Sequence, residues 1–432
     1  GTMYVHPEEK NTICFYVCAR EGNDENPGTQ NKPFASIQKA KKKVRVLISK
    51  GLENDICVYL KQGNYLLSEP LVFDKRDSAD NDFCIAYKAF SGERPLITGG
   101  RRIKNFKKVK NNLWKTNIPD FQNGSWVFRD LYKDDERLTI ARYPNKGCQY
   151  LYIKEIDKDH RRIVLTEYFD QGDYTNAEVV VLHLWAESIG KLAELKNNKL
   201  TTRYPIGLGG HGALAALKGR KLYLQNSPEF LAVPGEYYLD NKTGELLYLA
   251  HEGENPNNCD FFAPFTEKLV VIKGTEKQPV KNLSFEGLNF EYTNWLLPEK
   301  GFNEAQAGHH GTSWGKKPFM GLPGAIELEH TYQIKFEKCR LAHTGANGFA
   351  LGAGTSENLI IGCDVYDVSG NGIMVGHRMS PGKNAHWFNV DWDDPNHAPY
   401  KNRITCSSVV KAAQVMFGCT AIFDAYAQST GI

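Results

Sequence analysis

The sequence lacks the patterns that mark several common classes of protein. No apolar run approaches the roughly 18 residues that a membrane-spanning helix needs. It has no Gly-rich phosphate loop, no Ser-centred nucleophile elbow and no HExxH pair of metal ligands. The net charge is only +3, which gives no sign of a nucleic-acid partner. We therefore expect no membrane span and no nucleic acid, and carboxylate chemistry if the protein is an enzyme.

The ten cysteines show neither a CxxC pair nor the spacing of a zinc site. Two of them, Cys339 and Cys363, occupy equivalent places in a repeat, on the same side of their strands as Leu341 and Val365. This position favours buried free thiols over a disulfide framework. We expect no metal and no cofactor.

The repeat joins residues 339–348 to residues 363–372, with an offset of 24 residues. Each copy lies between short apolar segments of strand character and contains Gly and Asn at its corner. A period of this length predicts an all-β solenoid, because one such turn cannot bury its apolar face without its neighbours. Equivalent residues of adjacent turns should then lie about 4.8 Å apart.

The chain divides into three parts by the rhythm of its strands. Residues 1–103 contain short strands and an amphipathic helix at about 36–48, for which Ser36 is the expected N-cap and which could cover the open end of the solenoid. Residues 104–265 carry longer alternating strands and a hairpin, which predict an inserted β domain, a small sandwich or barrel. Residues 266–432 resume the solenoid, and we expect further turns beyond residue 432.

Two long excursions, 293–324 and 377–401, interrupt the last part and flank one predicted sheet from its two edges. Loops of this length in a tight repeat are usually functional. Their aromatic, imidazole and acidic side chains could contact a sugar, although about half of such tryptophans simply pack loops. The predicted substrate-binding residues are Trp295, His309, His310, Trp314, Trp387, Asp391 and Trp392. The acidic run around Asp391 could instead hold Ca²⁺, but it lacks the spacing of a known calcium loop.

Two carboxylates stand out along the predicted strands. Strand alternation points Ile326 and Leu328 inward, so Glu327 should be exposed on the sheet that the excursions flank. Asp424 takes the inward position that Leu351 and Val375 fill in other turns. A buried Asp is costly unless it is paired, so Asp424 is either functional or at a kink where the strand leaves the core.

His343 and Asp367 are also 24 residues apart and should stack at one corner. A contact between them would favour the protonated imidazole. The alternative is that both side chains bind the backbone of the corner, as polar turn residues commonly do. Either way, the pair is a candidate for catalysis (Asp367) and for substrate binding (His343).

Several stretches resemble bacterial right-handed parallel β-helix carbohydrate enzymes, namely residues 15–29, 32–37, 97–102, 136–145, 233–240 and 367–373. The resemblance is to glycoside hydrolase family 141, which includes α-L-fucosidase and xylanase activities, and it covers nearly the whole chain. It implies a right-handed coil, an inserted β domain, a groove along the coil and a pair of acidic catalytic residues. At least one member of that pair is expected beyond residue 432.

Our first hypothesis is a glycoside hydrolase that acts on a plant or host polysaccharide, with Asp424, Asp367 and Glu327 as catalytic carboxylates. The solenoid spacing would place two carboxylates at separations that retaining or inverting enzymes use. The alternatives are a polysaccharide lyase and a non-catalytic glycan-binding protein. We expect a monomer whose partner is a carbohydrate. The substrate class suggests a secreted or periplasmic protein, whereas ten unpaired cysteines would fit a cytoplasmic one.

Overall fold

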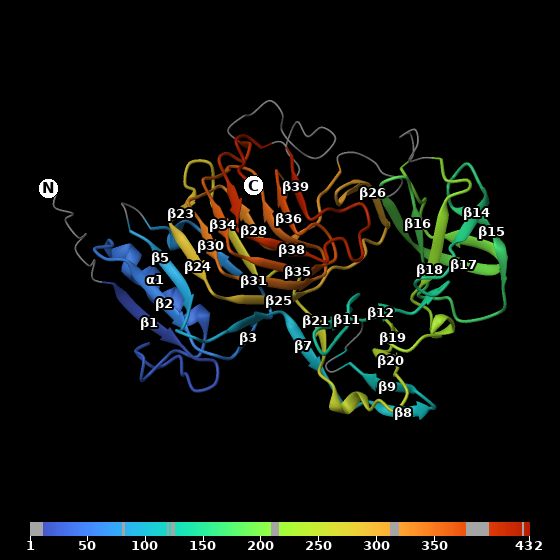
Figure 1. Cartoon of the computed structure of the whole chain (residues 1–432), viewed down its shortest axis with the longest axis horizontal. Helices are drawn as coiled ribbons and strands as arrows, with labels where there is room; N and C mark the ends of the chain where they lie inside the picture. Colours follow the sequence, from blue (N-terminus) through green and yellow to red (C-terminus); the bar gives the residue numbers. More distant parts are fainter. Residues whose placement is uncertain are drawn as a thin grey trace.

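The computed structural model describes residues 12–79, 83–118, 121, 126–208, 216–311, 319–376, 397–425 and 427–432. The chain is all-β apart from short helices, and three of its sheets are built from stacked parallel strands (Figure 1). After β1 and α1, each turn of the chain adds one strand to each of these sheets in succession. We call residues 12–98 and 270–432, apart from the insertions described below, the stacked turns.

The strands of the stacked turns are as follows. The first sheet contains β1 (Ile13–Val17), β2 (Ile56–Leu60), β5 (Ile85–Ala89), β24 (Leu283–Glu286), β30 (Lys335–Glu337), β34 (Leu359–Ile361) and β37 (Arg403–Thr405). The second sheet contains β3 (Asn64–Leu66), β6 (Leu96–Thr98), β25 (Asn289–Thr293), β31 (Arg340–Thr344), β35 (Asp364–Val368) and β38 (Ser408–Val410). The third sheet contains β4 (Leu71–Phe73), β22 (Val270–Lys273), β28 (Gly324–Glu329), β32 (Asn347–Leu351), β36 (Ile373–Val375) and β39 (Ile422–Asp424). A short ladder of β23 (Val280–Lys281), β29 (Thr331–Tyr332) and β33 (Thr355–Ser356) joins the third sheet to the first.

The register confirms the 24-residue repeat. Arg340 pairs with Asp364 and Leu341 with Val365 in parallel strands. Aligned side chains fill the interior between the sheets, and the rings of Phe285 and Phe336 stack with centroids 4.8 Å apart. Apolar area is therefore buried by stacking identical positions, which is why the sequence period is visible.

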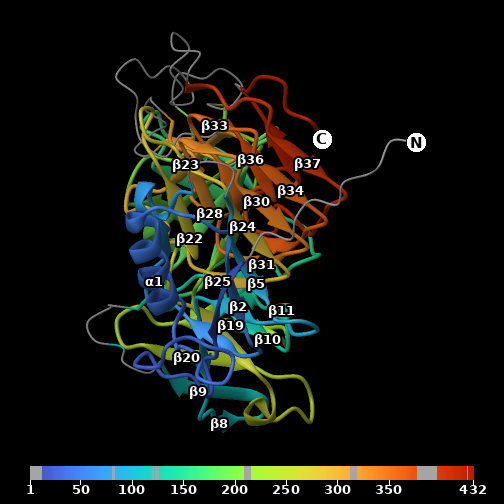
Figure 2. The ribbon, with the colours of Figure 1, turned by 90° about the vertical axis from the view of Figure 1, so that its left-hand side faces the viewer.

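Helix α1 (Ile37–Lys50) covers the N-terminal side of this interior, beside β1 and β2 (Figure 2). The Ser36 hydroxyl accepts a hydrogen bond from the Lys39 backbone amide, which confirms the predicted N-cap. Ile37, Ala40 and Val44 are buried on the face that contacts the sheets. The helix thus shields apolar surface that the first turn would otherwise leave open.

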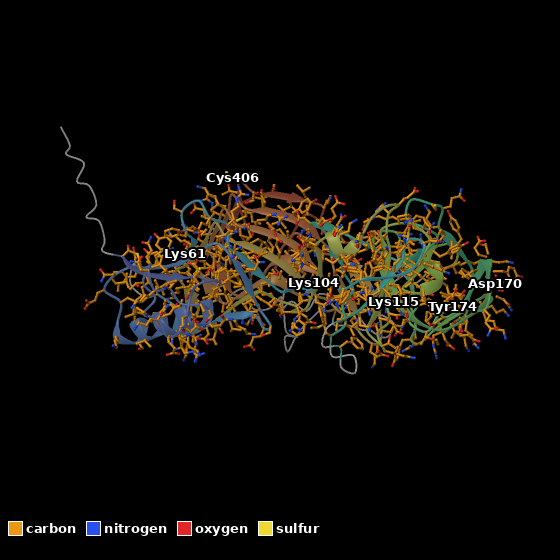
Figure 3. All side chains as sticks on the ribbon, turned by 90° about the horizontal axis from the view of Figure 1, so that it is seen from below. Lys61, Lys104, Lys115, Asp170, Tyr174 and Cys406 are labelled. Carbon is orange, nitrogen blue, oxygen red and sulfur yellow. The ribbon has the colours of Figure 1, made fainter. Side chains whose placement is uncertain are left out.

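Three insertions leave the stacked turns at the same corner, between the second and third sheets. They are residues 99–269, 294–323 and 411–421. The first forms an inserted domain that projects from the stacked turns (Figures 1 and 3). Asp170 and Tyr174 lie at its outer end, far from Lys61 of the stacked turns (Figure 3). Because successive turns stack, insertions at one corner are brought together in space.

The inserted domain contains two hydrophobic clusters. One lies among the sheets of β7 (Gly100–Ile103), β8 (Lys107–Lys110), β9 (Leu113–Asn117), β10 (Tyr132–Lys133), β11 (Glu136–Arg137), β12 (Thr139–Ile140), β19 (Glu236–Leu239), β20 (Glu245–Leu249) and β21 (Phe261–Pro264). The other lies under β13 (Arg142–Tyr143), β14 (Leu151–Ile156), β15 (Arg162–Phe169), β16 (Glu178–Leu182), β17 (Glu187–Thr202) and β18 (Lys221–Gln225). The predicted hairpin is present, with Tyr237 opposite Tyr248.

The second insertion extends a sheet of the first. Strand β26 (Phe302–Gln306) pairs antiparallel with β17, and β27 (His309–Gly311) follows at the edge. The backbone of this insertion is also tied to the stacked turns, because Asn371 donates to the Ala307 carbonyl and Asn347 donates to the Leu322 carbonyl. The insertion therefore connects the inserted domain to the third sheet.

A buried asparagine pair at this corner is the basis of our first prediction. The Asn347 side-chain oxygen accepts from both the backbone and the side-chain nitrogen of Asn371, at 2.9 and 3.0 Å. Replacing Asn347 by Ala leaves these buried donors without their acceptor. We expect a loss of about 1–3 kcal/mol of unfolding free energy, measured by urea denaturation. The exposed Asn258 provides the control, because Asn258→Ala removes no buried hydrogen bond; equal stabilities of the two variants would contradict the prediction.

Candidate active site at the junction with the inserted domain

A column of residues with left-handed backbone lies at the end of the second sheet, facing the inserted domain. Tyr292, His343, Asp367 and Lys411 occupy the same place in successive turns, with φ angles of 66°, 56°, 51° and 55°. Left-handed conformations are unfavourable for such residues and are often found at functional sites. The Tyr292 and His343 rings stack at 5.1 Å, so the column is packed as well as aligned.

The predicted contact between His343 and Asp367 is present. The Nδ1 atom of His343 lies 2.7 Å from Asp367 Oδ2, and its Nε2 atom lies 2.7 Å from Oδ1 of Asp135 in the inserted domain. The fully buried imidazole therefore lies between two carboxylates and joins the inserted domain to the stacked turns.

Arg137 of β11 makes a second connection at the same corner. Its Nε donates to Asp367 Oδ1 at 2.9 Å, and its terminal nitrogens donate to Asp130, to the Ser369 hydroxyl and to the carbonyls of Thr344 and Asp367. Asp130 and Asp367 are both buried. One guanidinium thus neutralises two buried carboxylates, one from each part of the molecule.

The environments of these two carboxylates shift their pKa values in opposite directions. Burial would raise the pKa of Asp367, but the Arg137 charge and the hydrogen bond from His343 outweigh it and hold this pKa at about 2. Burial dominates at Asp130 and raises its pKa, despite the attraction of Arg137. Such divergence is what distinguishes an acid from a base in carboxylate enzymes.

A cavity of about 360 Å³ opens beside this network, between the inserted domain and the stacked turns. Asp130, Asp367 and Arg137 line it, together with the exposed Asp135 and Glu136. Its other polar lining residues are Arg129, Thr139, Arg142, Lys146, Tyr223, Gln225, Tyr366, Lys411 and Gln414. It is a polar cleft large enough for a sugar residue and is open to solvent through its exposed side.

A second pair of carboxylates lies deeper in the junction. Glu187 of β17 and Glu304 of β26 are both fully buried. Burial raises the pKa of Glu304 to about 7, although the backbone amides of Gly308 and Glu187 donate to it. Gly418 packs against this carboxylate so closely that an added Cβ would lie 2.2 Å from Oε2.

Glu187 has the more unfavourable environment of the two. In the part of the chain that the structure describes, neither of its carboxyl oxygens has a hydrogen-bond partner, and burial together with the Glu304 charge raises its pKa well above the ordinary value. The Phe417 backbone amide counteracts this only as a neighbouring dipole, outside hydrogen-bonding geometry. The pair therefore favours protonated carboxyls and is sealed from solvent by the three insertions.

The expectation that Glu327 is exposed is wrong. Its register with Ala350 and Met374 is as predicted, but only 1% of the residue is accessible. Lys268 forms an ion pair with it at 2.7 Å, and the Gly324 amide donates to its other oxygen. Burial raises the pKa of Glu327, an effect that Lys268 opposes. Strand alternation could not reveal this cover, because Lys268 lies outside the strand.

Asp424 is aligned with Val375, as predicted, but it is exposed rather than buried. It lies on β39, the edge strand of the third sheet, where only one neighbouring strand packs against it. Partial burial raises its pKa, and the Thr430 hydroxyl is 3.4 Å from its Oδ1. Among the described residues, no hydrogen bond or ion pair links Asp424 or Glu327 to the junction network.

The predicted sugar-contacting residues are mostly buried or lie outside the described residues. Trp295 is buried against Phe302, with the Arg129 guanidinium 5.8 Å from its ring. His309 and His310 are buried, and burial lowers the pKa of each to about 4. These three residues therefore pack the insertion and offer no open ring face. Trp314, Trp387, Asp391 and Trp392 lie outside the described residues, as does the acidic run considered for Ca²⁺.

One group of side chains has the composition of a metal site. Asp135, Glu291 and His343 place ligand atoms within 4.8 Å of one another. However, Arg340 binds both carboxylates, and both ring nitrogens of His343 are engaged by Asp135 and Asp367. A guanidinium already occupies the position of a cation, so these residues do not fit a metal ion.

Sequence reasoning missed Asp130, Asp135, Arg137 and the Glu187–Glu304 pair as members of a site. They belong to the inserted domain or the second insertion, whose positions relative to the turns follow no sequence period. One signal was available, because Arg137 and Arg142 both lie in the stretch 136–145 that carries the family resemblance. The sequence pattern instead favoured the aromatic residues of the long excursions.

The fold as a whole is that of a solved glycoside hydrolase. The chain is similar to a structure named "Glycoside hydrolase", with a TM-score of 0.84 and 24% identity over 97% of this chain and 76% of that one. Two further structures are much less similar to the chain. They are XylC in complex with xylose (TM-score 0.48, 12% identity, 95% and 56% coverage) and the lacto-N-biosidase GH136 of Eubacterium ramulus (TM-score 0.33, 11% identity, 91% and 41% coverage).

No model of a known protein family matches the sequence, and no curated protein does. No helix among the described residues is long and apolar enough to span a membrane. The comparisons thus establish the shared fold and do not establish an activity.

The lowered pKa of Asp367 predicts a specific acid sensitivity. Its ionised form is favoured in the folded state, so its stabilising contribution is present above the ordinary pKa of 3.8 and is lost as the pH falls through about 2. The shift corresponds to about 2 kcal/mol. We expect Asp367→Asn to be less stable than the wild type at pH 5 and to lose less stability on acidification, as measured by urea denaturation. Parallel curves for the two proteins would contradict this assignment.

The raised pKa of Glu304 predicts the opposite dependence. Its protonated form is favoured in the folded state, so its stabilising contribution is present below the ordinary pKa of 4.5 and is lost as the pH rises through about 7. Between these limits the wild type should lose about 3 kcal/mol more than Glu304→Gln. Urea denaturation across this pH range measures the difference, with the exposed Glu155→Gln as control; a wild-type slope equal to that of Glu304→Gln excludes the prediction.

Proposed function

We propose that the protein is a glycoside hydrolase that binds an oligosaccharide in the cavity between the inserted domain and the stacked turns. The overall likeness to a glycoside hydrolase structure supports the class of fold. The observation that carries the proposal is the pair Asp130 and Asp367, which line one cavity, contact one guanidinium and have pKa values shifted in opposite directions. Glycosidases use two carboxylates in different protonation states across the scissile bond.

In this proposal each carboxyl has a separate task. Burial favours the protonated form of Asp130, which would donate its proton to the oxygen of the leaving group as the glycosidic bond breaks. Asp367 remains ionised and would stabilise the positive charge that develops at the anomeric carbon, or activate the water whose hydroxyl adds there. Arg137 is a positioning residue, because it holds both carboxyls and touches the cavity beside them.

The family assignment and the substrate are also proposals. We infer that the stacked turns form a right-handed parallel β-helix and that the chain is related to glycoside hydrolase family 141, on the strength of the N-terminal and 136–145 motifs. The substrate would be a plant or host polysaccharide or an oligosaccharide derived from it. A lyase on the same fold and a non-catalytic glycan-binding protein remain the alternatives that an activity test separates.

The test is a comparison of conservative variants on a panel of aryl glycosides and polysaccharides. Asp130→Asn and Asp367→Asn should each lower hydrolysis by about 10²–10⁴-fold, because proton transfer or charge stabilisation is lost. Glu155→Gln, an exposed carboxylate in the same domain, is the matched control and should retain full activity. Circular dichroism and thermal unfolding verify that each variant is folded.

Asp424 and Glu327, the other carboxylates predicted from the sequence, are tested in the same assay. If Asp424→Asn or Glu327→Gln abolishes hydrolysis while the junction variants retain it, the catalytic pair lies elsewhere on the stacked turns. New reducing ends accompanied by an unsaturated, ultraviolet-absorbing product would show elimination and support a lyase. Sugar binding by the full chain without any cleavage would support the glycan-binding alternative.

A further inference from the structure

We propose that the junction cavity binds a sugar carrying a carboxylate or sulfate group, and that Arg142 recognises this anion. The proposal rests on the proposed function, since it names the substrate class of the same cavity. It starts from an imbalance of charge among the lining residues. Arg142 is a buried cation that lines the cavity and has no ion-pair partner among the described residues.

Several contacts hold the Arg142 side chain in place. It lies on β13 opposite Gln225 of β18, with 8% of the residue accessible. Its guanidinium carbon lies 3.7 Å from the centroid of the Tyr223 ring and 5.9 Å from that of Tyr150. Its Nε donates to the Pro144 carbonyl at 3.0 Å. The aromatic faces and this carbonyl orient the guanidinium, but none of them supplies a negative charge.

The other arginines of the cavity are neutralised by the protein itself. Arg129 forms an ion pair with Glu178, and Arg137 forms ion pairs with Asp130 and Asp367. Glu236 is close enough to Arg142 to interact with its charge, but the Glu236 carboxylate accepts hydrogen bonds from the backbone amides of Ala232 and Val233. The Arg142 backbone amide and the Arg142 charge both favour the ionised Glu236 carboxylate, but no ion pair joins the two side chains among the described residues.

A buried cation without a partner lowers the stability of the folded protein unless an anion, such as a ligand, binds to it. Because the guanidinium is planar and its terminal nitrogens form a fork, the fitting partner is a planar carboxylate or a tetrahedral sulfate bound through two oxygens. The cavity is open to solvent, so this partner can be a ligand. A sugar with one such group would place its anion on Arg142 while its glycosidic bond lies near the carboxylates.

Two exposed lysines add to the positive charge of the cavity. Lys146 and Lys411 both line it, and Lys411 donates from Nζ to the Tyr366 hydroxyl at 2.7 Å. Three of the lining carboxylates are already engaged, Asp130 and Asp367 by Arg137 and Asp135 by Arg340. Glu136 is the remaining lining carboxylate. The cations without carboxylate partners therefore outnumber the free carboxylates, which favours an anionic ligand over a neutral one.

Isothermal titration calorimetry on the full chain tests the charge preference directly. The probes are glucuronate, galacturonate and a sulfated galactose, each compared with its neutral parent, glucose or galactose. We expect at least one anionic probe to bind about tenfold or more tightly than its parent, and this preference to decline as NaCl is added. Preference for a uronate or for the sulfated sugar identifies which anion the cavity takes.

Variants separate recognition by Arg142 from a general attraction of charge. Arg142→Gln should abolish the anionic preference and leave the weak affinity for the neutral parents, whereas Arg142→Lys should retain part of the preference. Arg101→Gln is the matched control, because Arg101 packs 3.5 Å from the Phe265 ring in the same domain but does not line the cavity. Thermal unfolding shows whether each variant is folded, and the salt dependence of the wild type tests the charge preference without any variant.

The outcomes also distinguish this inference from the proposed function. Equal binding of anionic and neutral probes, or an unchanged preference in folded Arg142→Gln, overturns the inference. Hydrolysis of neutral glycosides in that case would leave the glycosidase proposal intact. Tight binding of an anionic sugar with no cleavage of any acidic or neutral substrate would overturn the glycosidase proposal and retain the anion site.

Discussion

Arg137 lies between two buried carboxylates, Asp130 of the inserted domain and Asp367 of the stacked turns. Removal of either partner from such a network leaves an uncompensated charge in the interior, which typically costs about 3–5 kcal/mol. The inserted domain is therefore held in one orientation, and the cavity beside Arg137 has a defined shape. His343 reinforces this constraint, because its imidazole joins Asp135 to Asp367 across the same boundary. The site and the contact between the two parts of the molecule share the same charges.

The stacking of parallel turns explains why this boundary can be so polar. Insertions that leave the same corner of successive turns must meet, and here they bring together strands β11, β17 and β26 with the corner residues 367 and 417–419. The apolar side chains that stabilise the fold are buried elsewhere, in the interior between the three sheets and in the two clusters of the inserted domain. The junction can then carry buried carboxylates such as Glu187 and Glu304, whose raised pKa values record the energetic cost of their burial.

The repeat made the stacked turns predictable in detail, because parallel strands place residues 24 apart in direct contact. The contact between His343 and Asp367, the burial of Cys339 and Cys363 and the register of Glu327, Val375 and Asp424 all followed from counting along the chain. Burial was less predictable. Glu327 is covered by Lys268 and the Gly324 backbone, while Asp424 lies on an edge strand. The alternation of residues along a strand predicts neither the burial of Glu327 nor the exposure of Asp424.

The sequence by itself determined the all-β class, the repeat, the capping helix and the residues that stack in the columns, because these depend on contacts whose spacing is regular. Only the tertiary structure decided which charges meet at the junction, since the path of the inserted domain from residue 99 back to the stacked turns obeys no period. Arg137 and Arg142 are five residues apart in one short segment. Among the described residues, Arg137 forms ion pairs with two carboxylates and Arg142 forms none, and that difference arises from the packing of distant segments around each guanidinium.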